Sequence, residues 1–231
     1  MCGRFVVAGE RRDLLGLFEI EFEGDELPGD SWNVRPTDQV KVVIETAKGG
    51  PTVRRLESAR WSLVPAFAPS LKTKAPTFNA RSESAAEKPF FAKAVRSARA
   101  IIPASGYYEW KTEGGVKTPH YVHAESGMIA FAGLYSWWRD RALADDDPVR
   151  WHLTTTILTR DAVGALADIH PRTPVTLPPQ LWKAWLDPDT LGDAHLVEAA
   201  VAASLPEAEQ LVITPVAPIG NVDHAGLIEP L

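Results

Sequence analysis

Short stretches rich in β-branched and aromatic residues recur along the chain, and they constrain its fold more than any other feature. They lie at residues 100–103, 107–111, 121–123, 128–135 and 151–158, with turn signals at Gly114-Gly115 and Ser126-Gly127. Residues 40–45 and 52–56 flank the turn at 48–51 and predict a hairpin. Strands this short and closely spaced predict a mainly antiparallel β core.

Helical periodicity is limited to segments between and beyond these runs. It covers residues 11–18, 84–97, 161–169, 178–186 and 193–203, and Pro178 and Pro179 suit the first turn of their helix. We find no internal repeat and no linker rich in glycine, serine or proline. We therefore expect an α+β fold, with a β core edged by short helices, in a single domain over residues 1–231.

Composition limits the cellular compartment and the partners that we expect for the chain. Its single cysteine makes an intramolecular disulfide impossible. No apolar run is long enough to span a bilayer, and the start MCGRFVVAGERRD lacks a secretory signal, so we expect a reducing cytoplasm and no membrane partner. The net charge of −6 argues against a protein that coats duplex DNA through a broad basic face.

Basic residues nevertheless crowd the middle of the chain. They are Arg54, Arg55, Arg60, Lys72, Lys74, Arg81, Lys88, Lys93, Arg96 and Arg99. Such an asymmetry predicts either a local basic groove on an acidic protein or ordinary solvated charges.

Cys2 is the residue with the most unusual chemistry. Its small side chain favours removal of Met1, which would make it the N-terminal residue. The thiol and α-amine of such a cysteine have ordinary pKa values of about 8.5 and about 7.7–8.0, so both are nucleophilic near neutral pH. The amine can condense with an aldehyde and the thiol can close a thiazolidine ring; alternatively, the thiol attacks an ester or amide. Chance placement is the competing interpretation.

Three further polar residues stand out because of their surroundings. Glu109 lies in the aromatic segment GYYEW at 106–110, where burial would raise its pKa for acid–base use unless the side chain faces solvent. His170, next to Pro171, suits a general acid or base, or a merely capping role. Asn79 precedes a predicted helix and is either a site residue or a helix cap.

Two other features involve aromatic and histidine side chains. His120 and His123 could reach one metal ion, but no cysteine or carboxylate ligand is near them in sequence, so we expect no metal. Most tryptophans are expected in the core. Trp61, beside Arg60, is the candidate for stacking on a nucleobase.

Several segments together resemble the SRAP family of abasic-site shielding proteins. In family order they are MCGRF (1–5), WNVRPT (32–37), RWSLVP (60–65), FNARSE (78–83), IPASGYYEW (102–110), AGL (132–134), LT (158–159), IHPRTPV (169–175) and GNV (220–222). These segments cover nearly the whole chain, and the second-position cysteine anchors them.

The resemblance implies a barrel-like α+β domain with a groove for single-stranded DNA, or a junction of single and double strands, around Cys2. It implies that Cys2 forms a DNA–protein crosslink and that Asn79 positions the cysteine backbone or the opened sugar. Glu109 would move protons, and His170 would assist opening of the deoxyribose ring. The implied DNA-contacting residues are Arg4, Asn33, Arg35, Pro36, Trp61, Arg81, Thr159 and Arg172.

Three departures from the family pattern bear on these roles. Ala68 follows Phe67 where many members carry an aromatic pair, so one stacking contact is missing. Arg35 replaces a residue that is often small and adds a potential phosphate contact. Pro171 stands where relatives often have an acidic residue, which weakens the role of Arg172.

The expected function is covalent capture of abasic sites in single-stranded DNA during the DNA damage (SOS) response. We expect a monomeric crosslinking enzyme of the hydrolase or lyase class, nucleoid-associated when on DNA, with weak lyase activity and no cofactor. Two alternatives remain open. One is a cysteine peptidase or autopeptidase that uses Cys2 and His170, and the other is a non-enzymatic binder of single-stranded DNA junctions.

Overall fold

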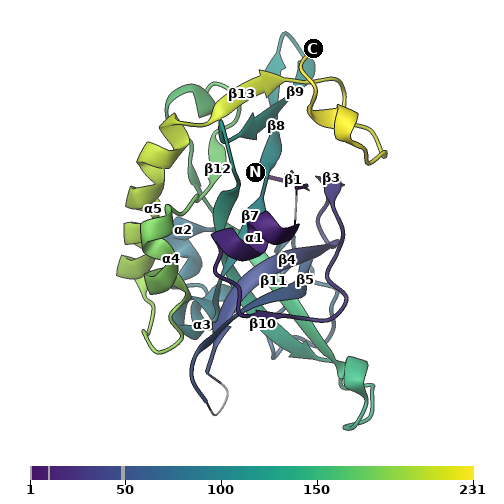
Figure 1. Ribbon diagram of the computed structural model, residues 1–231, viewed down its shortest axis with the longest axis vertical. Helices are drawn as coiled ribbons and strands as arrows, with labels where there is room; N and C mark the ends of the chain where they lie inside the picture. The colour runs from purple at the N-terminus through teal and green to yellow at the C-terminus, as the bar shows by residue number, and fades with distance from the viewer. Residues whose placement is uncertain (1, 10, 48–49) are drawn as a thin grey trace.

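The computed structural model describes residues 2–9, 11–47 and 50–231 (Figure 1). Its strands are β1 (Arg4–Val7), β2 (Phe22–Glu23), β3 (Ser31–Val34), β4 (Gln39–Thr46), β5 (Val53–Trp61), β6 (Asn79–Arg81), β7 (Arg99–Ala104), β8 (Gly106–Glu113), β9 (Val116–His123), β10 (Ile129–Arg139), β11 (Trp151–Asp161), β12 (Arg172–Pro174) and β13 (Val212–Pro215). The helices are α1 (Arg11–Leu17), α2 (Ser82–Ala85), α3 (Pro89–Ser97), α4 (Pro179–Leu186) and α5 (Ala194–Glu209), with 3₁₀ turns η1 (Pro148–Arg150), η2 (Gly164–Leu166) and η3 (Ala225–Ile228).

A closed barrel forms the centre of the molecule. Strands β5, β4, β7, β10 and β11 pair in that order, each antiparallel to the next, and β11 returns to pair with β5. That last pairing is parallel and joins Thr154 to Arg60 and Thr155 to Trp61. Five strands cannot alternate in direction all the way round, so one neighbouring pair must be parallel. This pairing closes the barrel and confirms the expected barrel-like α+β fold.

A second sheet, in the order β13-β9-β8-β1-β3, carries the start of the chain. Strand β1 pairs antiparallel with β8, and Arg4 lies opposite Tyr108. Figure 1 shows β1 near the middle of the molecule, beside β8. This pairing brings the segment around Cys2 next to the strand that contains Glu109.

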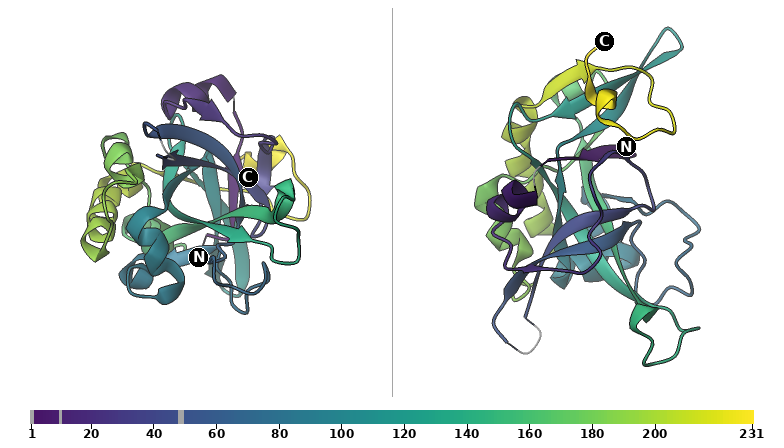
Figure 2. Two further views of the ribbon diagram at one scale, coloured as in Figure 1. Left: turned by 90° about the horizontal axis from the view of Figure 1, so that it is seen from below. Right: turned by 45° about the vertical axis from the view of Figure 1, so that its right-hand side comes forward.

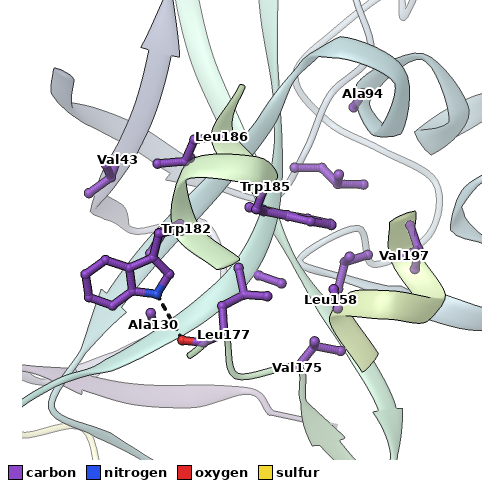
Figure 3. Packing of buried hydrophobic residues seen from close by; sticks show 14 of the residues in the cluster. Val43, Ala94, Ala130, Leu158, Val175, Leu177, Trp182, Trp185, Leu186 and Val197 are labelled. Carbon is purple, nitrogen blue, oxygen red and sulfur yellow. Dashed lines mark hydrogen bonds between the residues drawn. The ribbon is translucent and has the colours of Figure 1, made fainter. Parts of the chain in front are cut away.

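Helices α2 to α5 cover one flank of the barrel, as the two views of Figure 2 also show. The core between them includes the two indoles of α4 (Figure 3). Trp182 Nε1 donates to Leu177 O at 2.9 Å, and Trp185 Nε1 donates to Ala100 O at 2.8 Å, so both polar atoms are satisfied inside the apolar cluster. Among the described residues, no helix is long and apolar enough to cross a membrane.

Most elements expected from the sequence are confirmed. The hairpin is formed by β4 and β5, although Lys48 and Gly49 of its turn lie outside the described residues. The helix expected at 84–97 is divided into α2 and α3, because Pro89 cannot donate a backbone hydrogen bond and instead begins α3.

The prediction of a helix at residues 161–169 is wrong. Asp161 still belongs to β11 and pairs with Arg172 of β12. Gly164, the first residue of the 3₁₀ turn η2, has a φ of +56°, which lies outside the α-helical region, so no α-helix forms in this segment. The chain uses this segment to turn back toward His170.

Arg99 shows that part of the basic stretch is structural. Its side chain is buried, and its guanidinium donates to the carbonyl oxygens of Val95, Arg96, Trp185, Asp187 and Thr190. Most of these carbonyls lie at the C-terminal ends of α3 and α4, where backbone acceptors lack partners within the helix. Arg99 therefore fastens two helix ends to β7 and is not available to a groove.

We expect Arg99→Lys to lower the free energy of unfolding by about 2–4 kcal/mol. An ammonium group has three donors where the guanidinium has five, so at least two buried carbonyls lose their partner. Urea denaturation followed by circular dichroism measures the change. Arg96→Lys, at an exposed position three residues away, is the matched control; equal stability of the two variants would contradict the role of Arg99.

Candidate functional site

Cys2 lies in the core of the molecule. Its side chain is fully buried in a cluster that includes Phe5, Trp61 and Tyr107. The thiol donates to the carbonyl oxygen of Arg4, with Sγ and O 3.7 Å apart. Burial raises the pKa of the Cys2 thiol well above its ordinary value, and the charge of Glu109 raises it further. The thiol is therefore protonated at neutral pH and needs a base to become a nucleophile.

Asn79 holds the backbone of Cys2. It lies in β6, which runs parallel to β11, and its Nδ2 donates to Cys2 O at 2.7 Å. The N-cap of α2 is Arg81, without a side-chain capping bond, so Asn79 is not a helix cap. Its Oδ1 is buried and accepts no hydrogen bond in the described part of the chain. Asn79 thus offers an unused acceptor beside Cys2.

Glu109 is a buried carboxyl group on β8. Only 5% of the residue is exposed, which rules out the solvent-facing position that the sequence left open. Burial raises its pKa from 4.5 to about 7, because the charged form loses hydration. Near neutral pH the group exists in both protonation states, so it can donate and accept a proton. Its charge acts on the Cys2 thiol, so the two groups are electrostatically coupled.

His170 lies in the turn between η2 and β12. Its Nδ1 is 3.0 Å from both the backbone nitrogen and the carbonyl oxygen of Arg172. Partial burial lowers the pKa of the imidazole below its ordinary value, so the neutral form predominates at pH 7. The backbone of Arg172 thus fixes the orientation of a neutral imidazole ring through Nδ1.

The C-terminal segment fastens two of the expected DNA-contacting residues. Arg4 Nη1 donates to Asn33 Oδ1 at 2.8 Å and to Gly220 O at 3.0 Å. Asn33 is buried, and its Nδ2 donates to Val222 O at 2.6 Å. Asp223 accepts from the backbone nitrogen of Trp32 at 2.7 Å. We call residues 220–223 the C-terminal strap, because they tie the end of the chain across β1 and β3.

Arg172 is already bound to carboxylates. Its Nη1 lies 2.6 Å from both Glu83 Oε1 and Asp161 Oδ1, and its Nη2 donates to Thr159 O at 2.6 Å. Thr159 itself is fully buried on β11. A phosphate would have to compete with these two carboxylates for Arg172, which gives the residue a structural function in the free protein.

The stacking role expected for Trp61 needs correction. Its indole is fully buried, packs edge-on against Phe5 at 4.8 Å between ring centroids, and donates to Phe78 O at 2.8 Å. No face of the ring is open to a base. Arg81 is exposed, and Arg35 and Pro36 are partly exposed in the turn after β3, so these three remain accessible to DNA.

Sequence reasoning missed two parts of the site. One is the role of the C-terminal strap: GNV (220–222) matched the family pattern, but the sequence did not indicate what these residues contact. The other is a buried hydrogen bond of 2.8 Å between the hydroxyl groups of Tyr107 and Thr173. The signal for Tyr107 was its spacing of two residues from Glu109, which places both side chains on the same face of a strand.

Metal ligation finds no support among the residues that the structure describes. No group of three histidine, cysteine or carboxylate side chains is close enough to hold an ion there. His123 stacks on Tyr121 with ring centroids 4.8 Å apart, and its Nδ1 is 2.7 Å from Ala124 O.

Comparisons with known proteins agree on one family. The family model described as "SOS response associated peptidase (SRAP)" matches residues 1–222. The chain is 36% identical to the abasic site processing protein YoqW of Bacillus subtilis, covering 85% of this chain and 84% of that protein. It is 32% identical to the abasic site processing protein YedK of Escherichia coli over the full length of both.

Solved structures show the same fold. A crystal structure of a protein from Bacteroides thetaiotaomicron superposes with a TM-score of 0.78 at 19% identity and covers both chains completely. A second crystal structure, of a protein from Bordetella bronchiseptica, gives a TM-score of 0.75 at 23% identity, covering 94% of this chain and all of that one.

We expect Glu109→Gln to stabilise the protein at pH 8 but hardly at pH 4. Because the folded pKa of about 7 lies above the unfolded 4.5, ionisation disfavours the native state, and stability falls as pH rises between these values. The gain at pH 8 should be roughly 3 kcal/mol. Denaturation midpoints at both pH values measure it, with Glu113→Gln at the exposed end of β8 as control; a pH-independent effect would contradict the assignment.

Proposed function

The chain belongs to the SRAP family, and from that premise we propose that it processes abasic sites in DNA by covalent capture through Cys2. The observation that carries the proposal is the grouping of a buried thiol, an amide that holds its backbone, and a carboxyl group with a pKa of about 7. Relatives named abasic site processing proteins supply the class of substrate.

The proposed reaction joins the first residue of the processed protein to the opened sugar. An abasic site equilibrates between a closed hemiacetal and an open aldehyde. After removal of Met1, the α-amine of Cys2 attacks the aldehyde carbon, and water leaves as a C=N bond forms. The thiol sulfur then adds to that carbon, its proton passes to the nitrogen, and a thiazolidine ring results. The ring protects the imine from hydrolysis.

Three side chains can carry out the proton transfers and the positioning that these reaction steps require. Glu109 can protonate the departing hydroxyl and take up the thiol proton, because both of its protonation states are populated near pH 7. Asn79 orients the Cys2 backbone through its Nδ2, and its unused Oδ1 can accept from a hydroxyl of the opened sugar. Neutral His170 can take the hydroxyl proton of the closed hemiacetal and so open the ring.

DNA contacts complete the proposal. Arg81 and Arg35 are accessible to phosphates, and Pro36 lies beside Arg35 at the same edge. Arg4, whose carbonyl oxygen accepts from the Cys2 thiol, is linked to Asn33 through its guanidinium. A few local cations suffice to bind a single strand or a strand junction on a protein of net charge −6. We propose that a monomer acts in the cytoplasm, at the nucleoid, with slow β-elimination as a side reaction of the imine.

Crosslinking to a single-stranded oligonucleotide with one abasic site tests the proposal. Intact-mass analysis should show the protein without Met1 plus the DNA minus one water. Cys2→Ala should abolish the stable adduct, because no thiol can trap the imine. Glu109→Gln should slow its formation by at least about 100-fold, because proton transfer is lost. An identical oligonucleotide with an intact base is the control.

Failure of the wild-type protein to form this adduct would refute covalent capture. Turnover of a peptide that depends on Cys2 and His170 would instead favour the cysteine peptidase. DNA protection that survives Cys2→Ala unchanged would favour a non-covalent junction binder.

A further inference from the structure

A hydroxyl pair connects the two sheets beside Cys2. Tyr107 Oη and Thr173 Oγ1 are 2.8 Å apart, and both residues are buried, with 1% and 3% of their surface exposed. Tyr107 belongs to β8 of the sheet that carries the start of the chain, whereas Thr173 belongs to β12 on the barrel sheet. The bond therefore spans two elements that no strand ladder joins in the described residues.

The tyrosine end of this pair is next to the thiol and the carboxyl group. Tyr107 and Glu109 are two residues apart on β8, so their side chains leave the same face. Tyr107 and Cys2 share one buried cluster, in which the Tyr107 ring also meets Phe131 edge-on at 5.8 Å. Burial raises the pKa of the Tyr107 phenol, and charge on Cys2 and Glu109 raises it further, so the hydroxyl stays protonated.

The threonine end is next to His170. Thr173 pairs with Arg160 across the ladder of β11 and β12. The preceding residue, Arg172, holds His170 Nδ1 at 3.0 Å by its backbone and is itself anchored by Glu83 and Asp161. A shift of Thr173 would therefore move the backbone that fixes the imidazole.

We propose that the Tyr107–Thr173 hydroxyl pair positions His170 relative to Glu109, and so sets the separation of the two groups that exchange protons at Cys2. This inference rests on the proposed function, in which both groups act on one sugar. The pair acts through its neighbours and touches neither substrate nor reacting atoms, so both members are positioning residues.

Removal of one or both hydroxyl groups tests the pair. Tyr107→Phe and Thr173→Val each leave a buried hydroxyl without its partner and should lower stability. The double variant replaces both by apolar groups of similar shape, so stability should largely return. The crosslinking rate should stay about tenfold below wild type in all three, because the tie between the sheets is absent.

A second readout does not depend on crosslinking. NMR can follow the imidazole nitrogens of His170 during a pH titration. In all three variants their chemical shifts should differ from wild type, and the titration midpoint should move by about half a pH unit. Tyr108→Phe is the matched control: it removes a hydroxyl from the same strand on the opposite face, where it donates to Trp32 O at 2.9 Å. It should leave both the rate and the His170 titration unchanged.

These measurements distinguish failure of the positioning role from failure of the proposed function. A double variant that regains both stability and wild-type rate, with His170 titrating as in wild type, overturns the inference and leaves a purely structural hydrogen bond. If the wild-type protein forms no crosslink, the proposed function fails, and the His170 titration alone decides whether the pair positions the imidazole.

Discussion

The parallel pairing of β11 with β5 is the constraint on which the rest of the structure depends. A barrel of five strands needs one parallel pair to close, and β11 provides it. Beyond that pairing, the same strand aligns β6 in parallel and β12 antiparallel. Asn79 lies on β6, and the turn with His170 leads into β12. One strand thus places two segments of the site that are about 90 residues apart in sequence.

The local parts of this fold could be predicted from sequence, and the non-local parts could not. Alternating apolar residues and turn signals identified the hairpin β4–β5 and the strands β7 to β11. Strands β6 and β12 have three residues each, too few to carry a periodic signal, and both exist only because β11 pairs with them. The helix wrongly expected at 161–169 shares this cause, since pairing with β12 extends β11 through Asp161.

The site was predicted as a set of residues, while their environments came from the structure. Cys2, Asn79 and Glu109 stood out by their chemistry and surroundings, and the family resemblance assigned them roles. The pattern around Glu109, however, fits an exposed strand position as well as a buried one. Only packing decides between them, and it gives the carboxyl group its pKa of about 7. Burial likewise assigned Trp61 to the core. The hydroxyl contact of Tyr107 bridges 66 positions in sequence, a distance at which no pattern reports contact.

The C-terminal strap affects the order in which the protein folds during synthesis. Arg4 of β1 and Asn33 of β3 donate hydrogen bonds to Gly220 and Val222, which are synthesised 216 and 189 residues later. Synthesis proceeds from the N-terminus, so the hydrogen bonds of β1 and β3 with the C-terminal strap cannot form until residues 220–223 have been made. Cys2, near the start of the sequence, therefore reaches its final surroundings only after residues 220–223 have joined the fold, which makes assembly of the candidate site a late step of folding.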